Sequence, residues 1–230
     1  MKTSLYNQHI KLNAKMVDFA GFEMPIHYLK GINHECNAVR NDVGVFDVSH
    51  MGQIFIKGEN AFKFVQYITT NDVSKLSPGE CQYTVICNPE GGIIDDLILY
   101  CMEDGYLLVV NASNIKQDFE WIKNQQIDNV KITDLSEQIS LVAIQGPKSR
   151  GILNNIDDFK NHISDLGFYN FIDMSDDHGF KIISRTGYTG ELGFEIYGNH
   201  DFINSIWSLL VDKYSVSPIG LGARDILRME

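Results

Sequence analysis

Apolar residues recur with the spacing of a helix face in several stretches of the chain. The clearest stripe follows Asn60, a common N-cap residue, and consists of Ala61, Phe64, Val65 and Ile68. A second stripe follows Ser113 and consists of Ile115, Phe119 and Ile122. The same spacing predicts further helices over residues 4–12, 31–41, 147–156, 201–214 and 220–230.

Runs of β-forming residues dominate the middle of the chain. The runs CQYTVIC (81–87), IIDDLILYCM (93–102) and YLLVVNA (106–112) are separated by the turn sequences NPEGG and EDG. They predict a three-stranded antiparallel meander. Further strands are predicted over residues 45–58, 130–135, 139–146, 180–186 and 193–198, the last two as a hairpin. Because strands and helices mix without regular βαβα alternation, the predicted fold class is α+β.

Composition and charge exclude several classes of protein. The chain has 230 residues, 44% of them hydrophobic and 21% charged, which is typical of one large domain or two interlocked ones. Its formal net charge of −11 disfavours binding to nucleic acid or to anionic membranes, which needs clustered Lys and Arg. No run approaches about 18 apolar residues, so no membrane span is expected. The first residues show no signal or transit peptide. Four cysteines without a CxxC pair indicate reduced thiols, and we expect a cytoplasmic protein.

The segment IIDDLILY carries two adjacent aspartates on one predicted strand. Successive side chains alternate between faces, so Asp96 shares its face with Tyr100 while Asp95 points to the other face. The two therefore cannot act as a carboxylate pair on one substrate. Both faces are otherwise apolar, so each carboxylate needs hydrogen-bond partners. In the structural interpretation, each carboxylate accepts backbone N–H groups, for instance from the Gly91–Gly92 turn. In the functional interpretation, one carboxylate acts on a ligand, and Asp96 is the better candidate.

The segment GYTGELGFE contains glycines 187, 190 and 193 but is not a dinucleotide-binding loop. No GxGxxG pattern occurs and a strand follows, not a helix. Glu195 lies in that strand, where a carboxylate can accept two parallel hydrogen bonds from a flat N–H edge. The alternative is a solvent-facing glutamate on an edge strand.

The histidines do not predict a metal site. His34, Glu35 and Cys36 are helix neighbours that face different ways, so they cannot converge on one ion. For His50, a structural role is preferred over a role as a general base. Arg224 either pairs with a nearby aspartate or binds a ligand carboxylate.

Five motifs together resemble a known family. KMVDFAGFEMPIHY, VRNDVGVFDVSHMGQ, GGIIDDLILY, SRTGYTGELGFEI and GLGARDILRME occur in this order. The chain is similar over its whole length to the aminomethyltransferases, or T-proteins, of the glycine cleavage system. Each motif alone is weak, whereas five in order are highly specific.

The resemblance implies a particular architecture. It predicts two interleaved α/β domains with mainly antiparallel sheets, with residues 53–134 inserted into a first domain formed by 1–52 and 135–230. T-proteins continue beyond GLGARDxLRLE into a C-terminal barrel domain, and from the sequence ending at GLGARDILRME we expect this domain to be absent. The last predicted helix ends at Glu230 without a C-cap, which is explained either by fraying or by truncation, and the resemblance favours truncation.

The resemblance also implies a reaction and a set of site residues. The family transfers a methylene group from an S-aminomethyl lipoyl arm of the H-protein to tetrahydrofolate bound in a central cavity, and ammonia is released. No metal is implied. Asp96 matches the catalytic aspartate of the family. The residues that match the folate-binding positions, Asp96 included, are Met51, Tyr83, Asp96, Tyr100, Val110, Asn111, Tyr188, Glu195 and Arg224.

Three other readings stay open at this stage. A folate-dependent demethylase of the same fold acts on a small methylated substrate. A folate-binding scaffold without turnover, such as the related iron–sulfur-assembly proteins, lacks the chemistry altogether, although their cysteine motif is not seen here. The chain can also be a truncated folate-binding fragment without full turnover.

Overall fold

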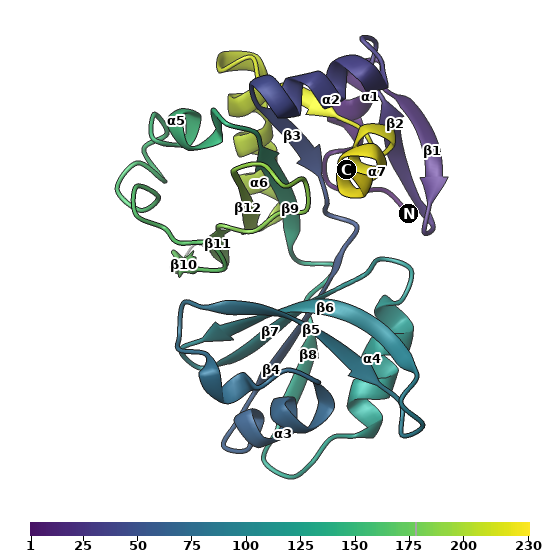
Figure 1. Cartoon of the computed structure of the whole chain (residues 1–230), viewed down its shortest axis with the longest axis vertical. Helices are drawn as coiled ribbons and strands as arrows, with labels where there is room; N and C mark the ends of the chain where they lie inside the picture. Colours follow the sequence, from purple (N-terminus) through teal and green to yellow (C-terminus); the bar gives the residue numbers. More distant parts are fainter. Residues whose placement is uncertain (178) are drawn as a thin grey trace. The chain divides into compact units, whose positions relative to one another are not determined.

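The computed structural model describes residues 1–177 and 179–230, and the chain divides into two compact units (Figure 1). Unit 1 comprises Met1–His50, Ser140–Phe168 and Met174–Glu230, and unit 2 comprises Met51–Ile139 and Tyr169–Asp173. Unit 2 is thus formed mainly by an internal segment of the chain. The domain boundaries expected from the sequence, at 52/53 and 134/135, remain a prediction.

Unit 1 contains two sheets and most of the helices. Its elements are α1 (Tyr6–Lys11), β1 (Lys15–Phe19), β2 (Phe22–His27), α2 (Ile32–Asn41), β3 (Gly44–Asp47), β9 (Ser140–Gln145), α5 (Ser149–Leu153), β11 (Lys181–Ser184), β12 (Gly193–Gly198), α6 (His200–Ser208), a π-helical turn (Leu209–Lys213), β13 (Ser217–Ile219) and α7 (Leu221–Met229). Strands β11, β12, β9, β3 and β13 lie side by side in this order. All these pairs are antiparallel except β13 with β3.

Large apolar side chains fill the core of unit 1. Helix α6 packs against β9 and β12, and α7 packs against α2 and β2. Phe46, Phe194, Tyr197 and Trp207 from these or adjacent elements are at most 1% exposed. Burial of such side chains contributes about 1.5–3 kcal/mol each before the entropic costs of folding. This core therefore holds β12, the strand that carries Glu195, between β11 and β9.

Unit 2 is a five-stranded antiparallel sheet with two helices. Its elements are β4 (Gly52–Lys57), α3 (Ala61–Ile68), the 3-10 turn Val73–Lys75, β5 (Cys81–Cys87), β6 (Ile93–Met102), β7 (Gly105–Val110), α4 (Ile115–Asn124), β8 (Lys131–Asp134) and β10 (Phe171–Asp173). The strand order of the sheet is β5-β6-β7-β4-β8. The predicted meander of β5, β6 and β7 is confirmed, with Tyr83 opposite Ile98 and Ile98 opposite Val109.

Helices α3 and α4 cover one face of the sheet in unit 2. The predicted stripe of α3 is buried together with Leu97 and Leu99 of β6 and with Leu108 and Val110 of β7. Asp95 lies on this covered face because it is two residues from Leu97. Asp96 therefore lies on the opposite face, as the alternation predicted.

A short segment far along the chain also belongs to unit 2. The backbone N–H of Cys81 donates to the carbonyl of Tyr169 at 2.9 Å, and that of Phe171 donates to the carbonyl of Gly79 at 2.8 Å. The ring of Tyr100 on β6 packs edge-on against the Phe171 ring with 5.2 Å between centroids. These contacts explain why Tyr169–Asp173 groups with unit 2.

The predicted fold class is confirmed, and the structure corrects several elements. The single strand expected over residues 45–58 is split, because Asp47 Oδ1 accepts the Ser49 N–H at 2.9 Å and turns the chain. The hairpin β1–β2 was not predicted; it turns through Ala20 (φ 52°) and Gly21 (φ 81°), a turn without the usual Asn-Gly signal. Asn60 precedes α3 but does not cap it with its side chain, which donates to the carbonyl of Asp128.

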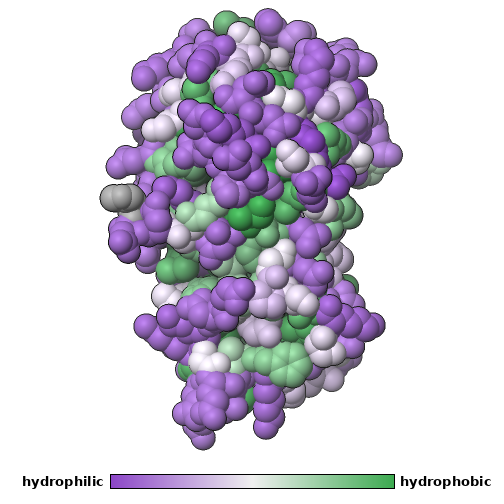
Figure 2. All heavy atoms as spheres, turned by 90° about the vertical axis from the view of Figure 1, so that its left-hand side faces the viewer, coloured by the Kyte–Doolittle hydropathy of each residue, from purple (hydrophilic) through white to green (hydrophobic). Residues whose placement is uncertain are grey.

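No helix in the described part of the chain is long and apolar enough to cross a membrane. The face shown in Figure 2 is mainly hydrophilic, with smaller apolar areas between the polar side chains.

Candidate functional site

The predicted site residues fall into one group in each unit, and the group in unit 2 centres on Asp96. Asp96 is half-buried on β6. The antiparallel register places Tyr83 of β5 beside Ile98, and Tyr100 follows two residues later, so the three predicted residues Tyr83, Asp96 and Tyr100 share one face of the sheet. Tyr83 is 48% exposed and Tyr100 is fully buried. This face is the one that α3 and α4 do not cover.

Asn111, the residue after β7, binds both aspartates. Its side-chain Nδ2 donates to Asp95 Oδ1 at 2.9 Å, to the backbone carbonyl of Asp96 at 3.0 Å and to Asp96 Oδ1 at 3.2 Å. The Asn111 backbone N–H donates to Asp95 Oδ2 at 3.1 Å. The carboxamide thus fixes the orientation of two neighbouring carboxylates that belong to opposite faces.

Asp95 is a buried, well-satisfied carboxylate. It is 5% exposed and also accepts a hydrogen bond from Asn114 Nδ2 at 2.8 Å. Burial alone raises its pKa, but hydrogen bonds from Asp118, Asn111 and Asn114 outweigh this effect and hold the pKa below its ordinary value. The expected donors of the Gly91–Gly92 turn are not used for this purpose: Gly92 N–H donates to Asn88 Oδ1. Asn111 and Asn114 satisfy Asp95 instead.

The other predicted residues of unit 2 differ in their access to a ligand. Met51 is half-buried just before β4. The Val110 side chain is 0% exposed and lies in the apolar core under the helices. The whole residue is buried, so Val110 presents no exposed surface to a ligand in this structure.

The group in unit 1 contains Tyr188, Glu195 and Arg224. The guanidinium of Arg224 lies 4.7 Å from the centroid of the Tyr188 ring. Within the described part of the chain, Tyr188 OH and Arg224 Nε are both buried without a geometrically satisfactory hydrogen-bond partner. Burial raises the pKa of Tyr188, and the positive charge of Arg224 opposes this only partly. Tyr188 therefore stays a neutral phenol, and the pair offers unsatisfied polar atoms of the kind that a polar ligand can use.

Glu195 is held by its neighbours on an interior strand. It is half-buried on β12, opposite Ala143 of β9 and Ser184 of β11. The hydroxyl of Thr186 donates to Glu195 Oε2. The alternative of a glutamate on an edge strand is therefore wrong, because β12 is paired on both sides.

Glycines are required in the loop that carries Tyr188. A Cβ at Gly187 or Gly193 would lie 2.3 Å or 2.2 Å from Oε1 of Gln145. The Gln145 carboxamide fills this space: its Nε2 donates to the carbonyl of Thr186 at 3.2 Å, and its Oε1 accepts from Thr189 Oγ1 at 2.9 Å. The glycines thus serve close packing of a hairpin corner.

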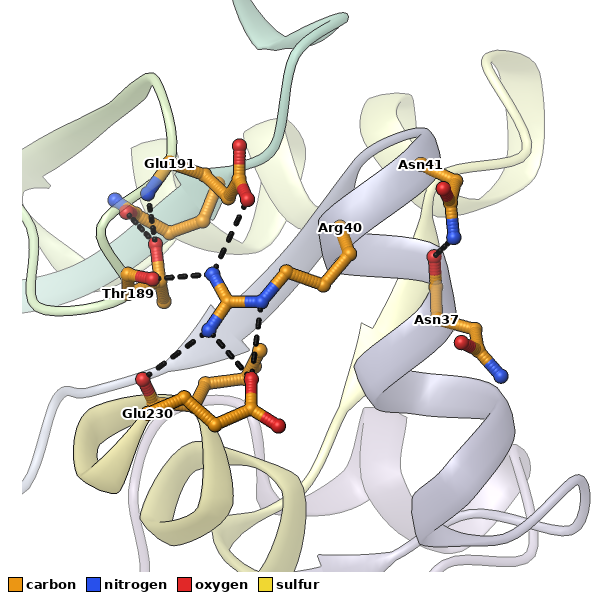
Figure 3. A network of polar contacts seen from close by, with 8 residues as sticks. Asn37, Arg40, Asn41, Thr189, Glu191 and Glu230 are labelled. Atoms are coloured by element: carbon orange, nitrogen blue, oxygen red, sulfur yellow. Dashed lines mark hydrogen bonds and ion pairs between the residues drawn. The ribbon is translucent and has the colours of Figure 1, made fainter.

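Arg40 of α2 joins this loop to the helix that carries Arg224 (Figure 3). Its Nη1 donates to Glu191 Oε1 at 3.2 Å and to the backbone carbonyl of Thr189. Its Nη2 and Nε donate to Glu230 Oε2 at 2.8 and 3.1 Å, at the end of α7. One guanidinium therefore connects the loop that carries Tyr188 with the helix that carries Arg224.

His50 is buried beside aromatic rings in unit 1. It is 1% exposed, and its ring packs edge-on to that of Phe19 at 5.5 Å between centroids. Burial lowers its pKa to about 4, although the negative charge of Asp47 opposes the shift. His50 is consequently neutral near pH 7. Among the described residues, no cluster of three or more His, Cys, Asp or Glu side chains is arranged to hold a metal ion.

The sequence analysis missed Asn114 and Asp118, which complete the polar cluster around Asp95. Asp118 is 0% exposed on α4, and its interaction with the Asp95 carboxyl group contributes, after burial, to a raised pKa of Asp118. The available signal was its position within the apolar stripe formed by Ile115, Phe119 and Ile122, where an ionised carboxylate is costly.

The fold and these two groups define a member of a known family. The chain matches the family described as "GCVT N-terminal domain" over residues 5–230 and belongs to it. Curated relatives named aminomethyltransferase from Pseudothermotoga lettingae and Bacillus subtilis are 48% and 46% identical over 234 residues. Each comparison covers 100% of this chain and 64% of the relative, so the chain spans less than two thirds of their length.

A solved structure agrees with this assignment. The crystal structure of glycine cleavage system aminomethyltransferase T from Bartonella henselae matches with a TM-score of 0.92 at 33% sequence identity. The match covers 100% of this chain and 62% of that one. The resemblance noted from the five motifs is therefore confirmed at the level of the family and the fold.

Proposed function

We propose that this chain carries the tetrahydrofolate-dependent chemistry of an aminomethyltransferase of the glycine cleavage system. The support is membership of the family and the names of relatives that cover the whole chain. In the proposed reaction, the methylene carbon of an S-aminomethyl group on the lipoyl arm of the H-protein passes to tetrahydrofolate. The C–S and C–N bonds break, and two C–N bonds form to folate N5 and N10. The two N–H protons of folate leave with the thiol and with ammonia, which gives dihydrolipoyl H-protein, 5,10-methylenetetrahydrofolate and ammonia.

Asp96 is proposed as the catalytic residue of this reaction. The transferred carbon becomes electron-poor and iminium-like, so a carboxylate close to it stabilises the positive charge that develops. The same carboxylate can accept a folate N–H proton. The observation that carries the proposal is that Asp96 lies half-buried on the face of the sheet that α3 and α4 leave uncovered, with its Oδ1 held by Asn111.

The residues of the two predicted groups are proposed as contacts for tetrahydrofolate. The pterin ring offers a flat edge of N–H donors, which suits the carboxylate of Glu195. Tyr188 and Arg224 supply an aromatic ring and a cation, and in unit 2 Tyr83 and Tyr100 supply further aromatic surface. Met51 and Asn111 are proposed as additional contacts, whereas Val110 is fully buried and is not. The reaction needs no metal, and the proposed protein partner is the lipoyl-bearing H-protein.

The direct test is the substitution Asp96→Asn. The assay measures ammonia released in a single turnover from aminomethylated H-protein and tetrahydrofolate. The amide keeps the size of the side chain but removes its charge and basicity, so release is expected to slow by about 100-fold or more. Tetrahydrofolate affinity, measured by calorimetric titration, is expected to change less than tenfold.

The matched control is Asp104→Asn, which changes an exposed aspartate of the same unit that pairs with Lys57. It should release ammonia at the rate of the unmodified chain. An Asp96→Asn variant with the unmodified rate would contradict the catalytic role. Release that does not depend on H-protein would point instead to a demethylase that acts on a small substrate.

A further inference from the structure

Asp118 is a buried acid that the proposed reaction does not use. It lies in the first turn of α4 and is 0% exposed. Within the described part of the chain, neither of its carboxyl oxygens accepts a hydrogen bond from an N–H or hydroxyl donor. It lies one helical turn after Asn114, whose carbonyl accepts the Asp118 N–H at 2.8 Å and whose Nδ2 donates to Asp95 Oδ1 at 2.8 Å, so the neighbouring acid is Asp95. An ionised carboxylate in such a place would be severely destabilising, so the arrangement is that of a protonated acid that donates to its neighbour.

Asp95 and Asp118 thus share one proton near neutral pH. Burial and, to a smaller extent, the interaction with the negatively charged Asp95 carboxyl group together raise the pKa of Asp118 to about 8. The hydrogen bonds that Asp95 receives lower the pKa of Asp95, against the effect of its burial. Asp95 is the titratable group that acts on Asp118, and the nearby Asn111 and Asn114 are neutral.

The pair is connected to Asp96 through one side chain. Asp95 Oδ1 and Oδ2 bind the Nδ2 and backbone N–H of Asn111, which restrains the carboxamide at two points. The same Nδ2 donates to Asp96 Oδ1 on the opposite face of the sheet. Because adjacent residues on a strand point apart, the side chains of Asp95 and Asp96 lie on opposite faces of the sheet. The Asn111 carboxamide, at the end of the neighbouring strand, supplies that connection.

We propose that Asp95 and Asp118 form a pair that positions Asp96. The pair acts by fixing the carboxamide of Asn111 against the Asp96 carboxylate. The inference rests on the proposed function, because it gives Asp96 the role that the pair supports. Loss of the shared proton places two negative charges side by side in a dry site. Asp95 then loses the donor from Asp118, and the sharing of the Asn111 N–H₂ group between Asp95 and Asp96 changes. A pair that served only to attach α4 to the sheet would not transmit this change to Asp96.

The test follows Asn111 and Asp96 by NMR in the chain labelled with ¹⁵N-Asn and ¹³C-Asp. In the unmodified chain, the Asn111 side-chain N–H₂ signals and the Asp96 carboxyl signal are expected to shift together with a midpoint near pH 8. In Asp118→Asn, the new amide donates permanently to Asp95, so both signals should stay near their low-pH positions from pH 7 to 9. Asp118→Ala removes the donor and should displace them at every pH. The control Asp104→Asn should titrate like the unmodified chain.

The pair has no positioning role if Asn111 and Asp96 show no common inflection between pH 7 and 9 in the unmodified chain. The same holds if the inflection persists in Asp118→Asn. The titration of the unmodified chain decides the matter even if a variant fails to fold. Since no folate or H-protein is present, the result is independent of the Asp96→Asn assay, and failure of one is distinguishable from failure of the other.

Discussion

Two neighbouring aspartates in β6 have different surroundings because side chains alternate along a strand. Asp95 faces the core that α3 and α4 cover, where Asn111, Asn114 and Asp118 surround it. Asp96 faces the uncovered side, where the side chain of Asn111 donates to it. The first therefore suits a structural or positioning task, and the second remains available to a ligand.

The raised pKa of Asp118 predicts a pH dependence of stability. In the unfolded chain this carboxyl loses its proton near 3.8, whereas in the folded chain it keeps the proton to about pH 8. The folded state therefore binds more protons between these values, and its free energy of unfolding falls as the pH rises through this range. Asp118→Asn removes this dependence. Urea unfolding at several pH values should show the variant gaining stability relative to the unmodified chain from pH 5 to 8, with no further gain above about pH 9. A constant difference from pH 5 to 8 would argue against a protonated Asp118.

Single residues of the site were only partly predictable. Asp96 was identified because a carboxylate on an apolar strand needs an explanation, and Glu195 because it follows a glycine-rich corner. Asn114 and Asp118 were missed because they lie on another element, and the sequence does not show which face of α4 meets β6. The partners of Asp95 were placed in the nearest turn, whereas the structure brings them from the end of β7 and from α4.

At the scale of elements, Arg40 stabilises the arrangement of α2, the loop 187–192 and α7. Arg40→Ala removes hydrogen bonds to the carboxylates of Glu191 and Glu230 and to the Thr189 carbonyl. Hydrogen bonds to charged groups are worth roughly 1.5–3 kcal/mol each when buried, and less here because the side chain is 27% exposed. We expect a loss of about 1–2 kcal/mol in the free energy of unfolding of unit 1, and faster amide exchange in residues 187–192.

Arg228→Ala provides the comparison for this prediction, since Arg228 is an exposed arginine on α7, the helix whose end Arg40 contacts. It should change the free energy of unfolding, measured with urea, by less than about 0.5 kcal/mol. Equal effects of the two substitutions would show that the Arg40 network does not hold the loop.

Elements with local signals were predicted well, and those that depend on distant partners were not. The meander β5–β6–β7 combines long apolar strands with short turns, so each pairing is between neighbours in the sequence. The hairpin β1–β2 turns through Ala20, which has a positive φ. Alanine rarely adopts this conformation, so the residue type does not predict the turn. The break between β3 and β4 depends on a side chain, Asp47, that binds its own backbone.

The arrangement of the whole chain depends on contacts between distant segments. Strand β9 pairs with β3, about a hundred residues earlier, and with β12, about fifty residues later. No local pattern predicts such pairings, and the expectation of interleaved domains came from resemblance to a family. Membership of that family is now shown for residues 5–230, while the curated relatives are longer than this chain.

The most direct test of the central claim is a crystal structure of this chain soaked with tetrahydrofolate. The proposed chemistry predicts that the Asp96 carboxylate lies within hydrogen-bonding reach of a folate nitrogen that accepts the methylene group, at about 2.6–3.2 Å directly or through one water molecule. Folate bound at a position remote from Asp96, or an Asp96 side chain turned away from the bound ring, would contradict the claim.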